Sequence, residues 1–150
     1  MAKNYSGRDM LFYVTEPTAP SVAATASDYT LVGLSTGVNI NSSRNAIDKS
    51  NKDDGDESTF VAGRRNSTIS GSCFWDHTSD TGQDHFQDAF ESSNGTIYFL
   101  CTSTTNNDVE FHGSGIVTQK NLSFPDEGIS QLDFEIQVSG ALTEVTGTTT

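Results

Sequence analysis

The sequence predicts a mainly β domain, a β-sandwich or a partly open barrel, with one short α-helix and one long polar loop. The clearest evidence is a stretch near the C-terminus in which apolar and polar residues alternate over four full periods. The apolar set is Leu132, Phe134, Ile136 and Val138, and the polar set is Gln131, Asp133, Glu135 and Gln137. Because side chains alternate across a strand, we expect one face of this strand to be packed and the other to be wet.

The helix is predicted at about residues 82–92, directly after a strand over residues 68–75. Phe86, Ala89 and Phe90 recur at the three- and four-residue spacing of a helix. The turn between the two elements offers three side chains that can accept hydrogen bonds from the first helical amides, those of Ser79, Asp80 and Thr81. A strand that runs directly into the helix of an otherwise β chain is the most specific feature of this sequence.

The other ordered segments are predicted to be strands. Apolar or alternating runs favour strands at residues 10–14, 29–34, 37–41, 96–102 and 109–118. Residues 44–58 carry almost no apolar side chain and are too long for a hairpin turn, so we predict a long polar loop there. Residues 1–150 are expected to form a single domain, in which residues 1–29 are an N-terminal strand and arm and residues 143–150 are a flexible C-terminal tail.

The chain carries a formal net charge of −12. This charge counts against a nucleic-acid reader, which needs basic side chains on the phosphates, and against binding to an anionic membrane. It suits a protein that stays soluble at high concentration, or a surface that repels DNA. No run is long enough to cross a bilayer and residues 1–10 lack the apolar stretch of a signal peptide, so we expect folding in the cytoplasm.

Two cysteines and the single tryptophan are interpreted as core residues. Cys73 and Cys101 both lie in predicted strands. A disulfide between them remains an alternative, but in a cytoplasmic chain two buried thiols acting as small hydrophobic side chains are favoured. Trp75 ends an inward-facing strand face and is expected in the core rather than on a ligand platform.

No pattern in the sequence favours catalysis or metal binding. No zinc-ligand spacing links the three histidines, which are His77, His85 and His112. An EF-hand loop centred on Gly55 would place Lys52 at a ligand position and Val61 where a glutamate is needed. Ser114 lacks the glycine two residues earlier that a nucleophile elbow requires, and its segment continues into a strand. We therefore predict neither an enzyme nor a cofactor.

The order of these elements resembles the major tail tube proteins of long-tailed, siphovirus-type bacteriophages. In that family a strand ending in an aromatic residue runs into an acidic turn and a short helix, a further strand follows, and a prolyl turn leads to an alternating last strand. The corresponding segments here are Ser70–Asp76, Gln83–Phe90, Phe111–Thr118, Ser123–Pro125 and Leu132–Leu142. The polar loop ahead of Phe60 also fits, and the resemblance covers about residues 30–142.

The resemblance implies a structural virion protein of the phage tail, assembled in the host bacterial cytoplasm. Its subunits would form six-fold rings whose inner sheets join edge to edge into one barrel, and the rings would stack into a tube. The implied partners are the chain itself, the tape measure protein and other tail proteins. DNA would pass through the tube during ejection without specific binding, and no membrane would be involved.

Two site hypotheses follow from the resemblance. The polar loop would reach the neighbouring ring, with Asp48, Asn51, Lys52, Asp53, Asp54, Asp56 and Glu57 as its contact residues. The polar face of the last strand would line the lumen, through Gln131, Asp133, Glu135 and Gln137. The alternatives are a solvated, mobile loop and an ordinary solvent-facing sheet.

Other functions remain open at this point. A tail terminator or another ring-forming tail protein would share the same small β plan but stop at one ring. A carbohydrate-binding or adhesion β-sandwich would need an exposed aromatic platform or a formed calcium loop. A small hydrolase would need a convergent catalytic site, which the motifs do not supply.

Overall fold

The computed structural model describes residues 10–15, 30–33, 35–76, 83–93, 95–103 and 109–146. Seven strands form one open antiparallel sheet in the order β2-β1-β5-β6-β7-β4-β3. The strands are β1 (Met10–Thr15), β2 (Thr30–Leu31), β3 (Ser35–Asp48), β4 (Phe60–Phe74), β5 (Thr96–Ser103), β6 (Val109–Ser123) and β7 (Gln131–Thr146). The helix α1 (Asp84–Glu91) follows β4 in the chain. The prediction of a mainly β fold with one short helix is confirmed.

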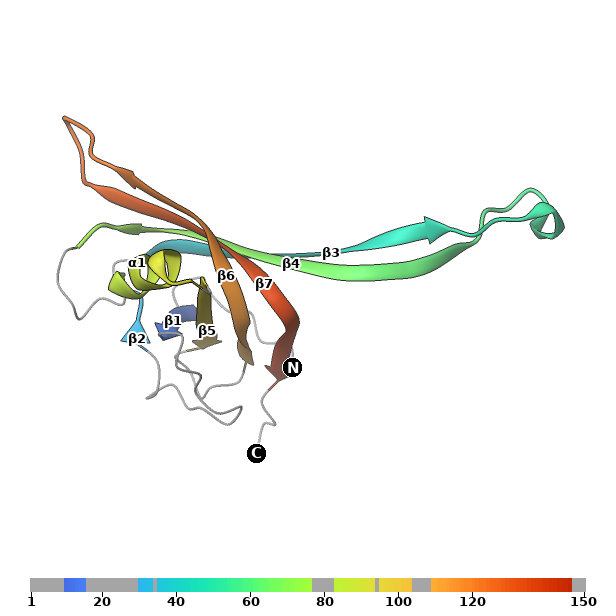
Figure 1. Ribbon diagram of the computed structural model, residues 1–150, viewed down its shortest axis with the longest axis horizontal. Coiled ribbons are helices and arrows are strands. Elements are labelled where there is room, and N and C mark those ends of the chain that lie inside the picture. The colour runs from blue at the N-terminus through green and yellow to red at the C-terminus, as the bar shows by residue number, and fades with distance from the viewer. Residues whose placement is uncertain are drawn as a thin grey trace, which may run out of the picture.

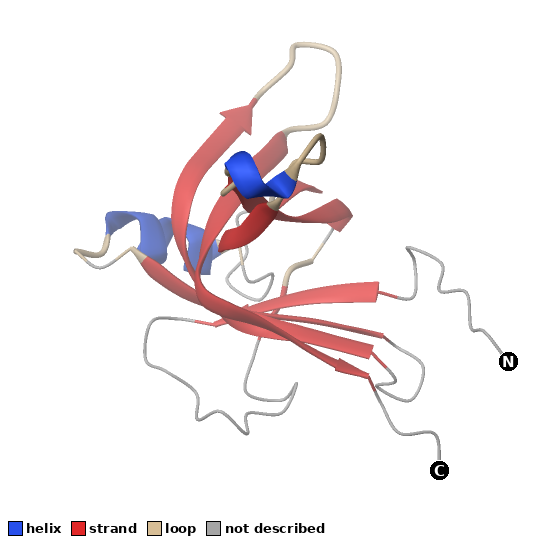
Figure 2. Ribbon diagram, turned by 90° about the vertical axis from the view of Figure 1, so that its right-hand side faces the viewer, coloured by secondary structure: helices blue, strands red, loops and turns tan. Residues whose placement is uncertain are grey.

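The sheet curls around its own core (Figure 1). Phe12 of β1 and Phe134 of β7 stack with their ring centroids 5.7 Å apart, although β5 and β6 lie between their strands in the sheet. Phe86 of α1 stacks on Phe134 from the same side, at 4.4 Å. Figure 2 shows the same curl viewed from the tip of the hairpin that β3 and β4 form. One aromatic side chain of β7 therefore joins the helix to the far end of the sheet.

Two glycines make this packing fit. A Cβ on Gly71 would lie 2.7 Å from the Phe134 ring and 2.9 Å from a backbone oxygen of Gly37. A Cβ on Gly115 would lie 2.6 Å from both the Ile136 side chain and a backbone oxygen of Gln137. Since both contacts are too close for any side chain, these strands need glycine where β4 and β6 pass the core residues of β7.

β3 and β4 extend far beyond the body as a hairpin. β4 pairs with β7 only from Thr68 to Phe74, so residues 60–67 pair with β3 alone. We call residues 42–67 the long hairpin; it points to the right in Figure 1. The predicted loop at residues 44–58 is shorter than expected, because Arg44–Asp48 continue β3 and pair with β4. Residues on both faces of this segment are exposed, so the sequence shows no strand alternation there.

The chain ends differ in part from expectation. β1 confirms a strand within residues 1–29, whereas residues 1–9 and 16–29 lie outside the described residues. The predicted tail at residues 143–150 is wrong for its first part, because Thr143–Thr146 pair with β6 as the end of β7. Backbone pairing with β6 extends this strand beyond the alternating segment from which it was predicted. Residues 147–150 are not described.

The predicted helix caps, Ser79, Asp80 and Thr81, also lie outside the described residues. α1 instead begins after Gln83, a buried side chain. Its Oε1 accepts from the Asp76 amide at 3.0 Å, and its Nε2 donates to the carbonyl oxygens of Phe74 at 2.7 Å and Gly33 at 3.3 Å. Gln83 thus ties the start of the helix to the end of β4 and to the turn after β2, a role the sequence did not reveal.

Trp75 is not a core residue. β4 ends at Phe74, and the Trp75 side chain is 37% exposed next to Phe124, which precedes β7. Phe90 is likewise exposed, whereas Phe86 and Ala89 are buried as predicted.

Cys73 and Cys101 are free thiols buried in the sheet. Burial, together with the smaller effect of the nearby negative charge of Asp133, raises the pKa of Cys73 to about 11. Burial also raises the pKa of Cys101. Both thiols therefore stay protonated near neutral pH and act as small core side chains. Within the described residues, no helix is long and apolar enough to cross a membrane.

Candidate functional site

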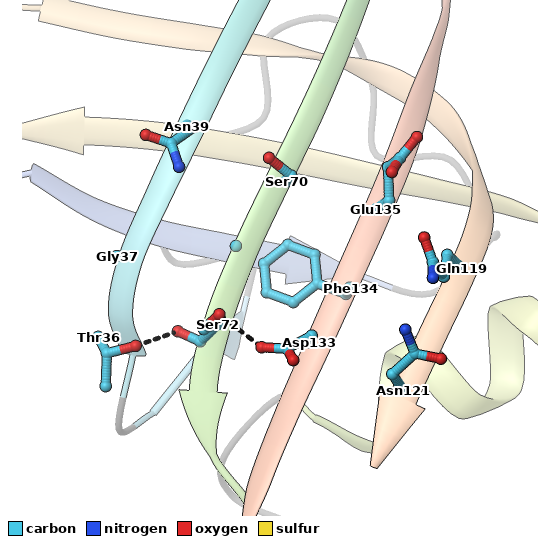
Figure 3. A pocket seen from close by; sticks show the side chains of 11 residues that line it. Thr36, Gly37, Asn39, Ser70, Ser72, Gln119, Asn121, Asp133, Phe134 and Glu135 are labelled. Atoms are coloured by element: carbon cyan, nitrogen blue, oxygen red, sulfur yellow. Dashed lines mark hydrogen bonds between the residues drawn. The ribbon is translucent and has the colours of Figure 1, made fainter. Parts of the chain in front are cut away.

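One side of the sheet carries a mainly polar surface, the polar face, which also includes the Phe134 ring (Figure 3). Four strands contribute to it, with Thr36 and Asn39 from β3, Ser70 and Ser72 from β4, Gln119 and Asn121 from β6, and Asp133 and Glu135 from β7. Directly opposite residues of antiparallel strands share a face. Accordingly, Asp133 lies between Ser72 and Asn121, and Glu135 lies between Ser70 and Gln119.

Hydrogen bonds tie the strands together on the polar face. Ser72 Oγ donates to Asp133 Oδ1 at 2.5 Å, and Thr36 Oγ1 donates to the Ser72 carbonyl oxygen at 3.0 Å (Figure 3). The residues of the polar face line a depression of about 350 Å³. At the other end, Gln137 Nε2 donates to the Ser67 carbonyl oxygen at 3.0 Å and also to the side chain of Asn66. The face continues in this way onto the long hairpin.

The predicted alternation of β7 is confirmed. Its four apolar residues are buried, whereas the polar residues between them remain half-exposed, namely Gln131, Asp133, Glu135 and Gln137. The structure therefore brings this predicted set together on one face of one strand. It also adds polar neighbours from three other strands, which no single-strand pattern could reveal.

The polar face is acidic. Asp133 and Glu135 have no lysine, arginine or histidine nitrogen within 4 Å in the described part of the chain. Two negative charges thus stand on a surface of hydroxyl and amide groups. No cluster of three metal-ligating side chains occurs among the described residues. The chemistry available here is hydrogen bonding to water and repulsion of anions.

The second predicted set lies at the tip of the long hairpin. The structure places all of it there, in β3 or in the turn with its short 3-10 helix η3 (Lys52–Asp54), namely Asp48, Asn51, Lys52, Asp53, Asp54, Asp56 and Glu57. Asn51 Oδ1 accepts from the Asp53 amide at 2.8 Å, and the Asn51 amide donates to Asp54 Oδ2 at 2.8 Å. This reciprocal capping closes the turn, which reverses at Gly55 with φ of +70°.

Further hydrogen bonds hold the two sides of the tip. The Lys49 amide donates to the Thr59 carbonyl oxygen at 3.0 Å, and the Thr59 amide donates to Ser50 Oγ at 2.9 Å. Hydrogen bonds from the Ser50 side chain and amide lower the pKa of Asp48. The tip therefore has a defined shape of its own, although none of its residues is buried.

Sequence reasoning missed the apolar side chains near both ends of the molecule. On the long hairpin, Ile47 lies directly opposite Val61, and Phe60 follows; all three are exposed. At the turn between β6 and β7, Phe124 and Ile129 are exposed. The sequence signal that could have revealed these side chains is the presence of large apolar residues beside polar turns, with no packing partner nearby in the sequence.

Comparison with known proteins gives a family. The chain matches the family model for the phage tail tube protein over residues 4–144. No curated protein sequence matches it. Solved structures, among them the three that follow, share its fold at low sequence identity, so their likeness concerns the fold alone.

The first is the tail of an empty gene transfer agent particle, with C6 symmetry, at TM-score 0.71 and 16% identity, covering 95% of this chain and 100% of that one. The second is the SPP1 tail tube, at TM-score 0.76 and 18% identity, covering 95% and 80%. The third is the tube-terminating cap of the anti-feeding prophage, at TM-score 0.63 and 15% identity, covering 98% and 95%. With the family model spanning nearly the whole chain, the protein belongs to the phage tail tube family and is a structural, tube-forming component of a phage tail.

Proposed function

We propose that six copies of this chain close into a ring and that the rings stack into a tail tube, a conduit for DNA during ejection. Family membership and the C6 symmetry of the matching gene transfer agent tail support this. The chain is then its own main partner, and the tape measure protein and other tail proteins are further partners in a virion assembled in the host bacterial cytoplasm. The observation that carries the proposal is the polar face, an acidic surface whose carboxylates have no cationic nitrogen within 4 Å among the described residues.

In this proposal the polar face lines the lumen. Phosphates passing through would meet carboxylates of like charge and a layer of amide and hydroxyl groups that hold water. Such a wall repels DNA and offers it no basic anchor, so DNA moves through without specific binding. The opposite face of the sheet is packed by α1 and β1 and cannot serve this purpose.

Charge reversal on the polar face tests the assignment. Tubes of Asp133→Lys/Glu135→Lys should retain short duplex DNA at low ionic strength at least tenfold more than wild-type tubes, as measured by co-sedimentation. A matched control is Asp84→Lys/Asp88→Lys, which makes the same charge change on the exposed side of α1. If both variants retain DNA equally, the polar face does not line the lumen.

Ring closure would satisfy the edges of the sheet. β3 is the outermost strand, and its outer edge faces no other strand in the described part of the chain. The opposite edge is formed by β2, which has two residues, and by β1. Exposed strand edges bind further strands readily. Joining the sheets of neighbouring copies through these edges would produce one continuous inner barrel.

The tip of the long hairpin is proposed to contact the neighbouring ring. It stands farthest from the body, and its turn is closed by hydrogen bonds without any buried residue. Deleting Asn51–Asp56 should therefore leave a folded protein whose rings no longer stack, seen as single rings by negative-stain electron microscopy. Tubes of normal length from this variant would overturn the role of the tip.

The first experiment is electron microscopy of the concentrated wild-type protein. Hollow tubes support the tube subunit, and isolated rings support a tail terminator. The terminator is the second candidate because the cap of the anti-feeding prophage shares this fold. A carbohydrate-binding role has weaker support: Trp75 and Phe124 are exposed, but their rings meet at 89° and form no flat platform. A glycan-array screen tests that role.

A further inference from the structure

The two edges of the open sheet come together at one point of the chain. β2 ends at Leu31 on one edge and β3 begins at Ser35 on the other edge, so the chain passes from edge to edge within a few residues. The Val32 amide still donates to the Phe12 carbonyl oxygen of β1 at 2.9 Å, and β3 pairs with β4 from Ser35 onward. We call Val32 and Gly33, which lie between the two edges, the crossing.

Away from the crossing, the two edges are not paired with each other. Between them lies a largely apolar cavity of about 400 Å³, whose lining includes Met10 and Phe12 of β1, Val38 of β3 and Cys101 of β5. In the described part of the chain, β3 pairs with β4 alone. The sheet is therefore an open barrel whose edges are held together by backbone at the crossing and separate from there.

One buried side-chain amide fastens the crossing. Gln83 is 5% exposed, and its Nε2 donates to the carbonyl oxygens of Gly33 at 3.3 Å and Phe74 at 2.7 Å. Its Oε1 accepts from the Asp76 amide at 3.0 Å. Both N–H groups and the oxygen of this amide are thus used. Because Phe74 is the last residue of β4, Gln83 ties the crossing to the side of the sheet that β3 and β4 form.

Apolar contacts also link the two sides of the sheet, but they constrain direction less. Phe12 of β1 and Phe86 of α1 both stack on Phe134 of β7. Burial of apolar surface is non-directional, whereas a hydrogen bond weakens steeply when its angle changes. The three hydrogen bonds of Gln83 therefore restrict the angle at which the two edges of the sheet meet.

We propose that Gln83 sets the angle between these two edges and thereby the number of copies in a ring. The inference rests on the proposed function, in which neighbouring copies join through the outer edge of β3 and the edge that β1 and β2 form. A head-to-tail interface closes into a ring only where the rotation from one copy to the next closes. A changed angle between the edges therefore changes the ring order or leaves the ring open. Gln83 is a positioning residue in this role, since it is buried and acts within its own copy.

Hydrogen exchange of the monomer tests whether Gln83 holds the crossing. Gln83→Met keeps the length of the side chain and removes all three hydrogen bonds. The Val32 amide, which is bonded to Phe12, should then exchange about tenfold faster. The Val117 amide donates to the Gly95 carbonyl oxygen at 3.1 Å and should keep its protection, which shows that the fold is intact. Unchanged exchange at Val32 would overturn the role of Gln83.

The number of copies per ring is the second measurement. Wild-type rings should form one class in electron micrographs and native mass spectra, whereas Gln83→Met rings should spread over more than one ring order or stay open. The matched control is Gln87→Met, which replaces a glutamine of α1 whose side chain donates to Glu91 of the same helix. This control should assemble like wild type.

The outcomes separate this inference from the proposed function. Gln83→Met rings of the wild-type order, together with faster exchange at Val32, would overturn the link between the crossing and the ring order and leave the proposed function standing. A wild-type protein that forms neither rings nor tubes would overturn the proposed function and this inference with it.

A milder variant is used where Gln83→Met also speeds exchange at Val117 and so loosens the whole protein. Gln83→Asn keeps the amide but shortens the side chain by a methylene group, so it no longer spans from Asp76 to Gly33. It should change Val32 exchange and ring order in the same direction and to a smaller extent. Wild-type behaviour of Gln83→Asn in both measurements would overturn the proposal.

Discussion

The body and the long hairpin share the strands β3 and β4 but are stabilised by different means. In β4, Ile69 is fully buried in the core of the body, whereas Val61 on the same strand is 46% exposed. No residue of the long hairpin is buried. A two-stranded hairpin without a packed face is marginally stable in water. The body therefore folds through its own core, whereas the long hairpin has no buried residue to stabilise it.

The largest effect is expected in the body. Phe134→Ala removes the ring that contacts both Phe12 and Phe86 and should lower the free energy of unfolding by about 3–5 kcal/mol. Chemical denaturation of the monomer measures this. Phe60→Ala, the same substitution on the long hairpin, is the control and should cost less than about 0.5 kcal/mol. Similar losses from both would remove the distinction between the two regions.

The second largest effect is expected at alkaline pH, which should lower the free energy of unfolding of the body. The folded pKa of Cys73 is raised to about 11, above its unfolded value, so the stabilisation is complete below the unfolded pKa and is lost as pH rises through the folded pKa. Between about pH 8.5 and 11 the free energy of unfolding should fall by about 2 kcal/mol on this account. Cys73→Ala should flatten that slope in denaturation curves recorded across the range. An unchanged slope in Cys73→Ala would contradict the assignment.

A smaller effect of opposite sign is expected on the long hairpin. Arg65→Ala removes one of two like charges in direct opposition and should stabilise the isolated monomer by about 0.2–1 kcal/mol. Hydrogen exchange of the hairpin amides measures the local gain. Arg64→Ala is the control, because it removes an arginine that is not a member of the pair that Arg65 forms with Arg44. A loss of protection in Arg65→Ala would show that Arg65 is held within its own copy.

The smallest effect on the body should come from shortening the hairpin. Deleting Asn51–Asp56 should change the global free energy of unfolding by less than about 0.5 kcal/mol, because no deleted residue is buried. Thermal denaturation of the monomer tests this. A drop comparable with that of Phe134→Ala would mean that the body depends on the tip.

The sequence allowed prediction of the elements that have one packed face. β7 could be recognised because Leu132 and Ile136 are buried while Asp133 between them is not, so the pattern follows directly from burial. α1 could be recognised because Phe86 and Ala89 face the core at helical spacing. The two site hypotheses also mapped to single surfaces, because each drew on residues close in sequence.

The remaining features depend on partners distant in sequence. The C-terminal part of β3 has no packed face. Although it pairs with β4 up to Asp48, its sequence therefore lacks the alternation of apolar and polar residues by which a strand can be recognised. Trp75 packs against Phe124, and the buried side chain of Gln83 donates to the carbonyl oxygen of Gly33. Local propensity and periodicity carry no information about such contacts.

The composition of β3 has a consequence for the unassembled protein in a crowded cell. Long free edges are templates for aggregation, above all where they are flat and hydrophobic. β3 is instead rich in serine and asparagine, and its partly buried apolar residues, Val38 and Ile40, pack toward the core. Solvated polar strands are poor nuclei for amyloid. We therefore expect unassembled copies of the protein to resist fibril formation at high concentration.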